Sequence, residues 1–219
     1  MPISNEMKKY PICDTDIWIK SCKLKKENYI FDKFNKLVFS DAVIVELENK
    51  KNDNKDEFGI GYDSLNKYKD YYHELSIKDK IFFNSKERKI AKRLFHNNKI
   101  DYNYETNSFD KRTEHLGEKV SLIYASIHNM SVMLSDDNDS KEYKSYIRNR
   151  FKTVKIINLV DLLIMNGISK DDALKIRKEV SKSVKEKELE REVEKQLNKN
   201  STVNRLSLLK EAMIKKGIM

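Results

Sequence analysis

The sequence contains only two cysteines, Cys13 and Cys22, which is too few for a disulfide framework. This scarcity favours a reducing compartment, and we expect a cytoplasmic protein. The four histidines are scattered, so no Cys and His cluster has the spacing of a zinc site. The sequence also lacks the apolar run of ~20 residues that crosses a bilayer, and its first residues lack the apolar stretch of a signal peptide. We therefore expect no membrane association.

Positive charge is in excess, because 44 Lys and Arg residues against 35 Asp and Glu residues give a formal net charge of +9. Such an excess favours a polyanionic partner, since Lys and Arg release counterions from phosphates when they bind. The alternative is a Lys-rich composition without functional meaning, because Lys, Asn and Ile are all abundant. Composition alone does not decide between the two.

Short apolar runs alternate with amphipathic segments, which predicts an α/β fold with a central parallel sheet. We expect buried strands within 10–19, 132–134 and 153–157, and helices over 85–99, 118–129 and 158–166. Residues 42–47 fit either a helix that is capped by Ser40-Asp41 or a β-branched strand.

Four short stretches place an acid beside an apolar run, and they contain Asp14, Glu46, Glu118 and Asp137. In parallel sheets, sites lie at the carboxyl ends of the strands, so these acids could converge there. Carboxylate oxygens suit the hard ions Mg²⁺ and Mn²⁺. Taken singly, each acid also has an ordinary explanation as a capping residue, a first-turn glutamate or a turn residue.

In this order, the four stretches resemble the signatures of the PIN-domain family of metal-dependent nucleases. The matching segments are Ile12-Cys13-Asp14-Thr15-Asp16, Ser40 to Glu48, Leu116-Gly117-Glu118 and Leu134-Ser135-Asp136-Asp137. The similarity covers roughly 8–48 and 114–180. It implies a PIN-like three-layer fold and a site that binds Mg²⁺ or Mn²⁺.

The resemblance also implies a role for each acid. Asp14, Glu46, Glu118 and Asp137 would be the catalytic acids, and the metal ligands among them would be Asp14, Glu118 and Asp137. Asp16, Asp136 and Asp139 would be auxiliary, and Ser135 would orient the loop. The choice among Asp136, Asp137 and Asp139 stays open at this point.

Two segments depart from a compact PIN domain. Residues 49–113 are rich in charged and aromatic residues and are expected to form an insertion within a nuclease domain of residues 1–180. Its basic helix would present Arg88, Lys89, Lys92 and Arg93 to a nucleic acid, unless the insertion serves only for packing. Residues 181–219 alternate Lys and Glu and predict a charged helical tail that contacts a protein, or else a solvated tail.

The expected function is a metal-dependent endoribonuclease that acts on RNA, resembling the toxin of a toxin–antitoxin pair. Its partners would be RNA and an antitoxin or other protein bound through the tail, with a homodimer as a further option. One alternative is a non-catalytic nucleic-acid or protein-binding module on a degenerate PIN fold. Another is a DNA nuclease of a mobile-element defence system.

Overall fold

The computed structural model describes residues 7–53, 59–106, 108–110, 115–136, 154–182, 193 and 214. Its internal contacts divide the chain into two units, Met1–Arg177 and Lys178–Met219. The first unit contains the sheet and every predicted site residue. Most of the expected tail over 181–219 lies outside the described residues. In the part of the chain that is described, no helix is long and apolar enough to cross a membrane.

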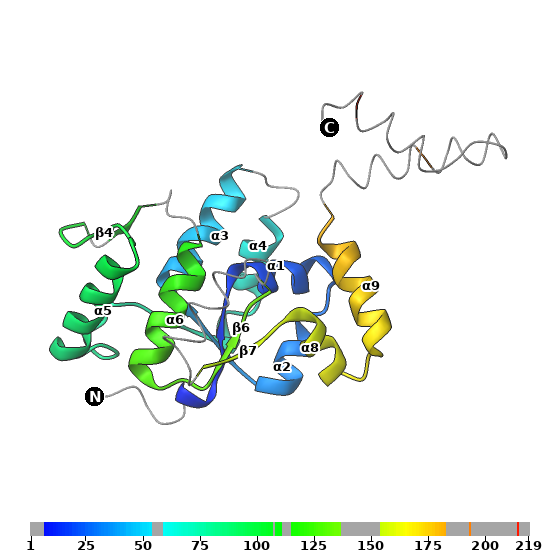
Figure 1. Ribbon diagram of the computed structural model, residues 1–219, viewed down its shortest axis with the longest axis horizontal. Coiled ribbons are helices and arrows are strands. Elements are labelled where there is room, and N and C mark those ends of the chain that lie inside the picture. The colour runs from blue at the N-terminus through cyan, green and yellow to red at the C-terminus, as the bar shows by residue number, and fades with distance from the viewer. Residues whose placement is uncertain are drawn as a thin grey trace. The chain divides into compact units, whose positions relative to one another are not determined.

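In the described residues, five parallel strands form the central sheet in the order β3-β2-β1-β6-β7 (Figure 1). The strands are β1 (Ile12–Cys13), β2 (Leu37–Ser40), β3 (Tyr72–Leu75), β6 (Val132–Leu134) and β7 (Lys155–Ile157). Ile12 pairs with both Val38 and Met133, so β1 is central. The chain builds outward from β1 to β3 and then returns to β6 on the other side of β1. The carboxyl ends of β1 and β6 therefore flank a topological switch point, where α/β proteins place their ligands.

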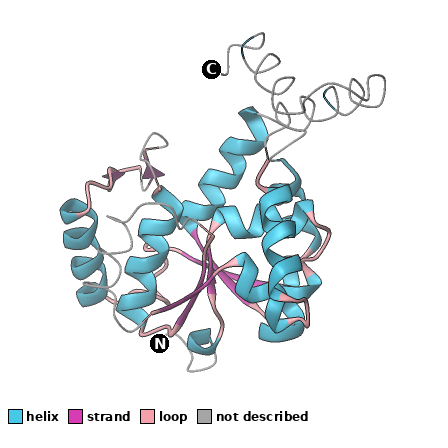
Figure 2. Cartoon of the chain, turned by 45° about the vertical axis from the view of Figure 1, so that its right-hand side comes forward, coloured by secondary structure: helices cyan, strands magenta, loops and turns pink. Residues whose placement is uncertain are grey.

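Helices cover both faces of this sheet, which gives the unit three layers (Figure 2). The helices are α1 (Thr15–Lys23), α2 (Asn28–Phe34), α3 (Asp41–Asp53), α4 (Gly59–Lys67), α5 (Ser85–Asn97), α6 (Leu116–His128), α8 (Leu159–Met165) and α9 (Lys170–Val180), with short 3₁₀ turns η1 (Met7–Lys9) and η2 (Lys69–Tyr71). Helix α5 packs on α6, whereas α1 and α2 pack on α8. The expected α/β class with a helix-flanked parallel sheet is confirmed.

Local capping explains where several helices begin. Asn84 and Glu87 form a reciprocal capping box at the start of α5, and Asn158 and Asp161 form another at the start of α8. At the start of α3, Asp41 Oδ1 accepts a hydrogen bond from the Ala42 amide at 3.0 Å. The segment after Ser40 is therefore a helix, and the alternative of a strand over 42–47 is wrong.

Part of the segment 49–113, which was expected to form an insertion, belongs to the main sheet. Strand β3 pairs with β2 along its whole length. The sequence did not predict this strand because β3 lies at the sheet edge, where only Leu75 of its residues is buried. Helix α5 and a two-stranded ribbon, β4 (Tyr102–Asn103) with β5 (Ser108–Phe109), lie outside the main sheet.

Helix α4 also belongs to the main fold, because it packs closely on α1 and α3. A Cβ atom at Gly61 would lie 2.8 Å from Ile19 Cγ1 and 2.9 Å from Leu47 Cδ2. The Trp18 indole N–H donates to the Gly61 carbonyl at 2.8 Å. Glycine is therefore required at this crossing, since any side chain would push the helices apart.

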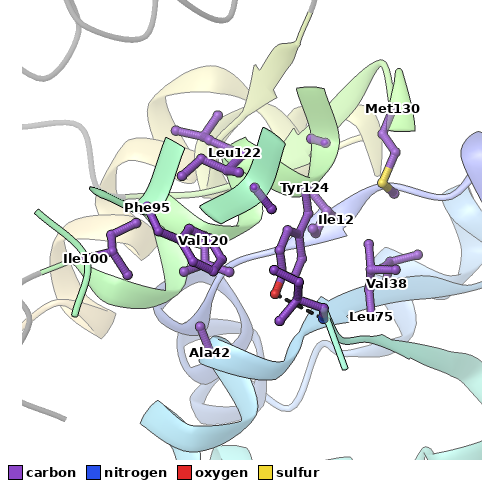
Figure 3. Packing of buried hydrophobic residues seen from close by; sticks show 14 of the residues in the cluster. Ile12, Val38, Ala42, Leu75, Phe95, Ile100, Val120, Leu122, Tyr124 and Met130 are labelled. Atoms are coloured by element: carbon purple, nitrogen blue, oxygen red, sulfur yellow. Dashed lines mark hydrogen bonds between the residues drawn. The ribbon is translucent and has the colours of Figure 1, made fainter. Parts of the chain in front are cut away.

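A large buried cluster joins the sheet to α5 and α6 (Figure 3). Ile12, Val38 and Leu75 enter it from three neighbouring strands, and Tyr124 enters from α6. The Tyr124 hydroxyl accepts a hydrogen bond from the Ile77 amide at 3.3 Å. This bond ties the loop after β3 to α6. Both cysteines are buried and free.

Candidate functional site

Asp14 and Ser135 lie side by side at the switch point of the sheet. Asp14 directly follows β1, and its amide donates to the Leu134 carbonyl at 2.9 Å. Asp14 also caps α1, because its Oδ1 accepts from the Thr15 amide at 2.8 Å. The strand before it and the helix after it thus fix the position of the carboxylate.

The Ser135 hydroxyl connects Asp14 with Glu118. Its Oγ lies 3.2 Å from Asp14 Oδ2 and 3.1 Å from Glu118 Oε1. Asp14 is 4% exposed and Glu118 is 2% exposed. One hydroxyl has one proton to donate, so it can donate to only one of the two carboxylates at a time. A cation between the carboxylates would reduce the repulsion between them.

Glu118 reaches this position from the first turn of α6, where the helix dipole favours an acid. The residue before this helix, His115, has a φ of 53° and serves as its N-cap. Its Nδ1 lies 3.9 Å from Glu118 Oε2, close enough for an ion pair when the imidazole is protonated.

Glu46 links the helices that carry the other two acids. The Thr15 hydroxyl donates to Glu46 Oε2, and the Gly117 amide donates to Glu46 Oε1 at 2.9 Å. A Cβ atom at Gly117 would lie 2.6 Å from Glu46 Oε2 and 3.0 Å from Val43 Cγ2. Glycine at position 117 therefore lets α6 approach Glu46 closely. This geometry gives Glu46 a positioning role at the rim of the site.

The aspartates expected to be auxiliary lie in different surroundings. Asp16 is half-buried in the first turn of α1. Asp136 is fully enclosed, with Lys20 Nζ at 2.6 Å, Arg177 Nε at 2.9 Å and the Leu159 amide at 3.3 Å. Because cations and an amide already occupy its oxygens, Asp136 is better suited to hold the loop than to bind a metal.

Asp137 and Asp139 lie outside the described residues. Asp137 directly follows the anchored Asp136 in the chain. Among the residues that the structure describes, no group of three or more His, Cys, Asp or Glu side chains is arranged to hold a metal ion. The described part of the candidate centre therefore consists of Asp14 and Glu118, with Ser135 between them.

The four basic residues expected to bind nucleic acid separate into two pairs on α5. Arg88 and Lys92 line a pocket of about 270 Å³ together with Ile77, Lys78, Lys80, Tyr102 and Tyr104, whereas Lys89 and Arg93 do not. Lys89, Lys92 and Arg93 are exposed, and Arg88 is half-buried. The sequence did not group these residues, because they come from a loop, a helix and a ribbon that are separate in the chain.

A further buried acid, Asp41, lies at the carboxyl end of β2. Its Oδ2 accepts from the Ser76 hydroxyl at 2.6 Å, and its Oδ1 accepts from the Tyr124 hydroxyl at 3.1 Å. Burial raises the pKa of Asp41 to about 6, although both hydroxyls oppose that rise, and the charge of Glu74 adds to it. The sequence indicated only a capping role for this residue.

Comparison with known proteins provides no further assignment for this chain. A scan against protein families matches none of them, and a search of curated proteins finds no match. The chemistry of the site therefore follows from its own residues.

Proposed function

We propose that this protein is a metal-dependent ribonuclease with a PIN-like fold. The observation that carries the proposal is the convergence of Asp14 and Glu118 on the Ser135 hydroxyl at the switch point. Two buried carboxylates that lie close to the same hydroxyl can place their oxygens around one divalent cation. The +9 net charge is consistent with an RNA substrate.

Asp14 and Glu118 would hold Mg²⁺ or Mn²⁺, with Asp137 as the third ligand. The donor set fits, because carboxylate oxygens are the ligands that these hard ions prefer. When bound, the ion would supply a nucleophilic water and would reduce the charge on the phosphoryl oxygens. Ser135 would keep the two carboxylates in position, and Glu46 would fix the starts of α1 and α6 around them.

The cellular setting is part of the same proposal. A cytoplasmic ribonuclease of this size, with a charged tail over 181–219, fits the toxin of a toxin–antitoxin pair whose antitoxin binds the tail.

The direct test is cleavage of a labelled single-stranded RNA by the purified chain with Mn²⁺. We expect Asp14→Asn to lower the rate by about 100-fold or more, because a metal ligand is lost while the capping oxygen stays. Glu118→Gln should act in the same direction. The control is Glu48→Gln, which changes an exposed acid on α3. This variant should cleave RNA at the wild-type rate.

Calorimetric titration with Mn²⁺ gives a second readout that does not depend on turnover. The wild type should bind the ion, and Asp14→Asn should bind it much more weakly. Undiminished cleavage by Asp14→Asn would disprove the proposal. Cleavage of DNA in preference to RNA would point to the defence-nuclease alternative. RNA binding without cleavage, unaffected by EDTA, would instead support a non-catalytic module.

A further inference from the structure

A second charged region lies outside the acid site, in the pocket between α5, the loop after β3 and the ribbon. Among the described residues, four cationic side chains line it, and no carboxylate does. These cations are Lys78, Lys80, Arg88 and Lys92. Within the described part of the chain, none of the four forms an ion pair. The pocket therefore has a concentrated positive charge that a bound anion would balance.

Arg88 and Lys92 reach the pocket from one face of α5, because they are four positions apart. The Arg88 Nε atom is buried and has no hydrogen-bond partner among the described residues. A buried N–H without a partner is costly, so it marks a place where a ligand oxygen would be stabilising. Guanidinium groups are well suited to phosphate oxygens.

Two tyrosine rings form the other wall of the pocket. The rings of Tyr102 and Tyr104 are 4.9 Å apart at an interplanar angle of 65°. Tyr102 is 8% exposed and is fixed by Phe109, whereas Tyr104 is 42% exposed. Lys92 Nζ lies 4.2 Å from the centre of the Tyr104 ring. Proteins that bind single-stranded nucleic acids use exposed aromatic rings to stack the bases and nearby cations to bind the phosphates.

We propose that this pocket binds one nucleotide of a single-stranded RNA, with the phosphate on Arg88 and Lys92 and the base against Tyr104. A volume of about 270 Å³ suits one nucleotide unit rather than a duplex. A free mononucleotide offers the same phosphate and base, and the experiment below distinguishes it from a nucleotide unit within RNA. The choice of RNA as the polymer rests on the proposed function. The binding of a phosphate and of a base follows from the residues of the pocket alone.

The pocket lies at the same edge of the sheet as the acid site. Its loop follows the carboxyl end of β3, and Asp14 follows the carboxyl end of β1. These strands are two positions apart in the sheet, which corresponds to about 10 Å. A single strand that is held in the pocket could thus extend toward the acids.

The test measures binding of a short fluorescent oligoribonucleotide in EDTA, which prevents metal-dependent cleavage. We expect Lys92→Gln and Arg88→Gln each to weaken binding by about tenfold, since each loses a charge-assisted contact. Lys89→Gln and Arg93→Gln are matched controls, because they remove the same charges from side chains of the same helix that do not line the pocket. They should change the affinity by less than about twofold at 0.15 M salt.

Ring and ligand variants complete the test. Tyr104→Ala should weaken binding and Tyr104→Phe should not, because only the alanine removes the ring. The oligonucleotide should bind more tightly than uridine monophosphate, and uridine without phosphate should not bind. A mononucleotide that binds as tightly as the oligonucleotide would assign the pocket to a free nucleotide and would overturn the RNA assignment.

Three results would overturn the inference itself. They are equal weakening by all four charge variants, inorganic phosphate binding as tightly as the nucleotide, and duplex RNA binding as tightly as single strands. The outcomes for the two proposals are separable. Binding through the pocket without any cleavage would refute only the nuclease, whereas cleavage with equal binding by all variants would refute only the pocket.

Discussion

Asp136 and the pair of Asp14 and Glu118 are buried near the carboxyl ends of β1 and β6, and they differ in their neighbours. Asp136 is enclosed by Lys20 and Arg177, which neutralise it and engage both of its oxygens. Asp14 and Glu118 instead converge on the neutral Ser135 hydroxyl. An acid whose oxygens are engaged by two cations stabilises a loop, whereas two acids that share one hydroxyl lie close enough to hold an added cation between them. The partners of an acid, rather than its burial, thus distinguish structural from functional candidates.

The largest effect on stability is expected from removing Asp136. Asp136→Ala leaves the ammonium of Lys20 and the guanidinium of Arg177 without their anion in a largely buried site. We expect the free energy of unfolding in urea to fall by about 3 kcal/mol. The control is Asp63→Ala, which breaks the exposed ion pair with Lys51 and should cost about 0.5 kcal/mol or less. Equal losses of unfolding free energy from both variants would show that the buried pairing of Asp136 stabilises the fold no more than an exposed ion pair does.

The second effect concerns Asp41, whose partners are hydroxyls rather than cations. Its pKa of about 6 in the folded protein exceeds the value of 3.8 for an unperturbed aspartate. The folded state therefore holds the proton more tightly, and the resulting stability is complete below about pH 4 and is lost as the pH rises through about 6. The loss corresponds to about 3 kcal/mol.

The measurement compares urea unfolding of the wild type and Asp41→Asn from pH 4 to pH 7. The difference in the free energy of unfolding between the two proteins should change by about 2 kcal/mol from pH 4 to pH 7, because asparagine does not titrate and the remainder of the change lies at lower pH. The comparison removes the contribution of His128, whose pKa is lowered by burial to about 4 and which acts in the opposite direction. Parallel curves for the two proteins would contradict the raised pKa of Asp41.

The smallest effect, on cleavage, is expected from Gly117→Ala. The added methyl group would meet Glu46 Oε2 and would disturb its bonds to Thr15 and to the start of α6. We expect the cleavage rate to fall by about tenfold, equivalent to about 1.4 kcal/mol, because Glu118 shifts with the helix. Gly59→Ala is the matched control, since its Cβ would have its nearest neighbour at 3.8 Å. An unchanged cleavage rate for Gly117→Ala would contradict the positioning role of Glu46.

Much of the acid site could be predicted from the sequence because local signals place it. Asp14 follows an apolar strand and caps a helix, and Glu118 opens a helix with clear apolar periodicity, so both positions follow from neighbouring residues. The edge strand β3 was not predicted, because Tyr72 and His73 are only half-buried and Glu74 is exposed, which leaves no apolar pattern.

The partners of each acid depend on residues that are distant in the chain. Lys20 is 116 positions from Asp136, and Arg177 is 41 positions from it, so no local pattern links them. The pocket likewise combines a loop, a helix and a ribbon. The sequence by itself determined the helices α5, α6 and α8, the parallel α/β class and the candidate acids, because short-range periodicity and capping encode these features. Only the tertiary structure decided which acid is neutralised, which acids face each other and which cations share a pocket, because charges interact through space and not along the chain.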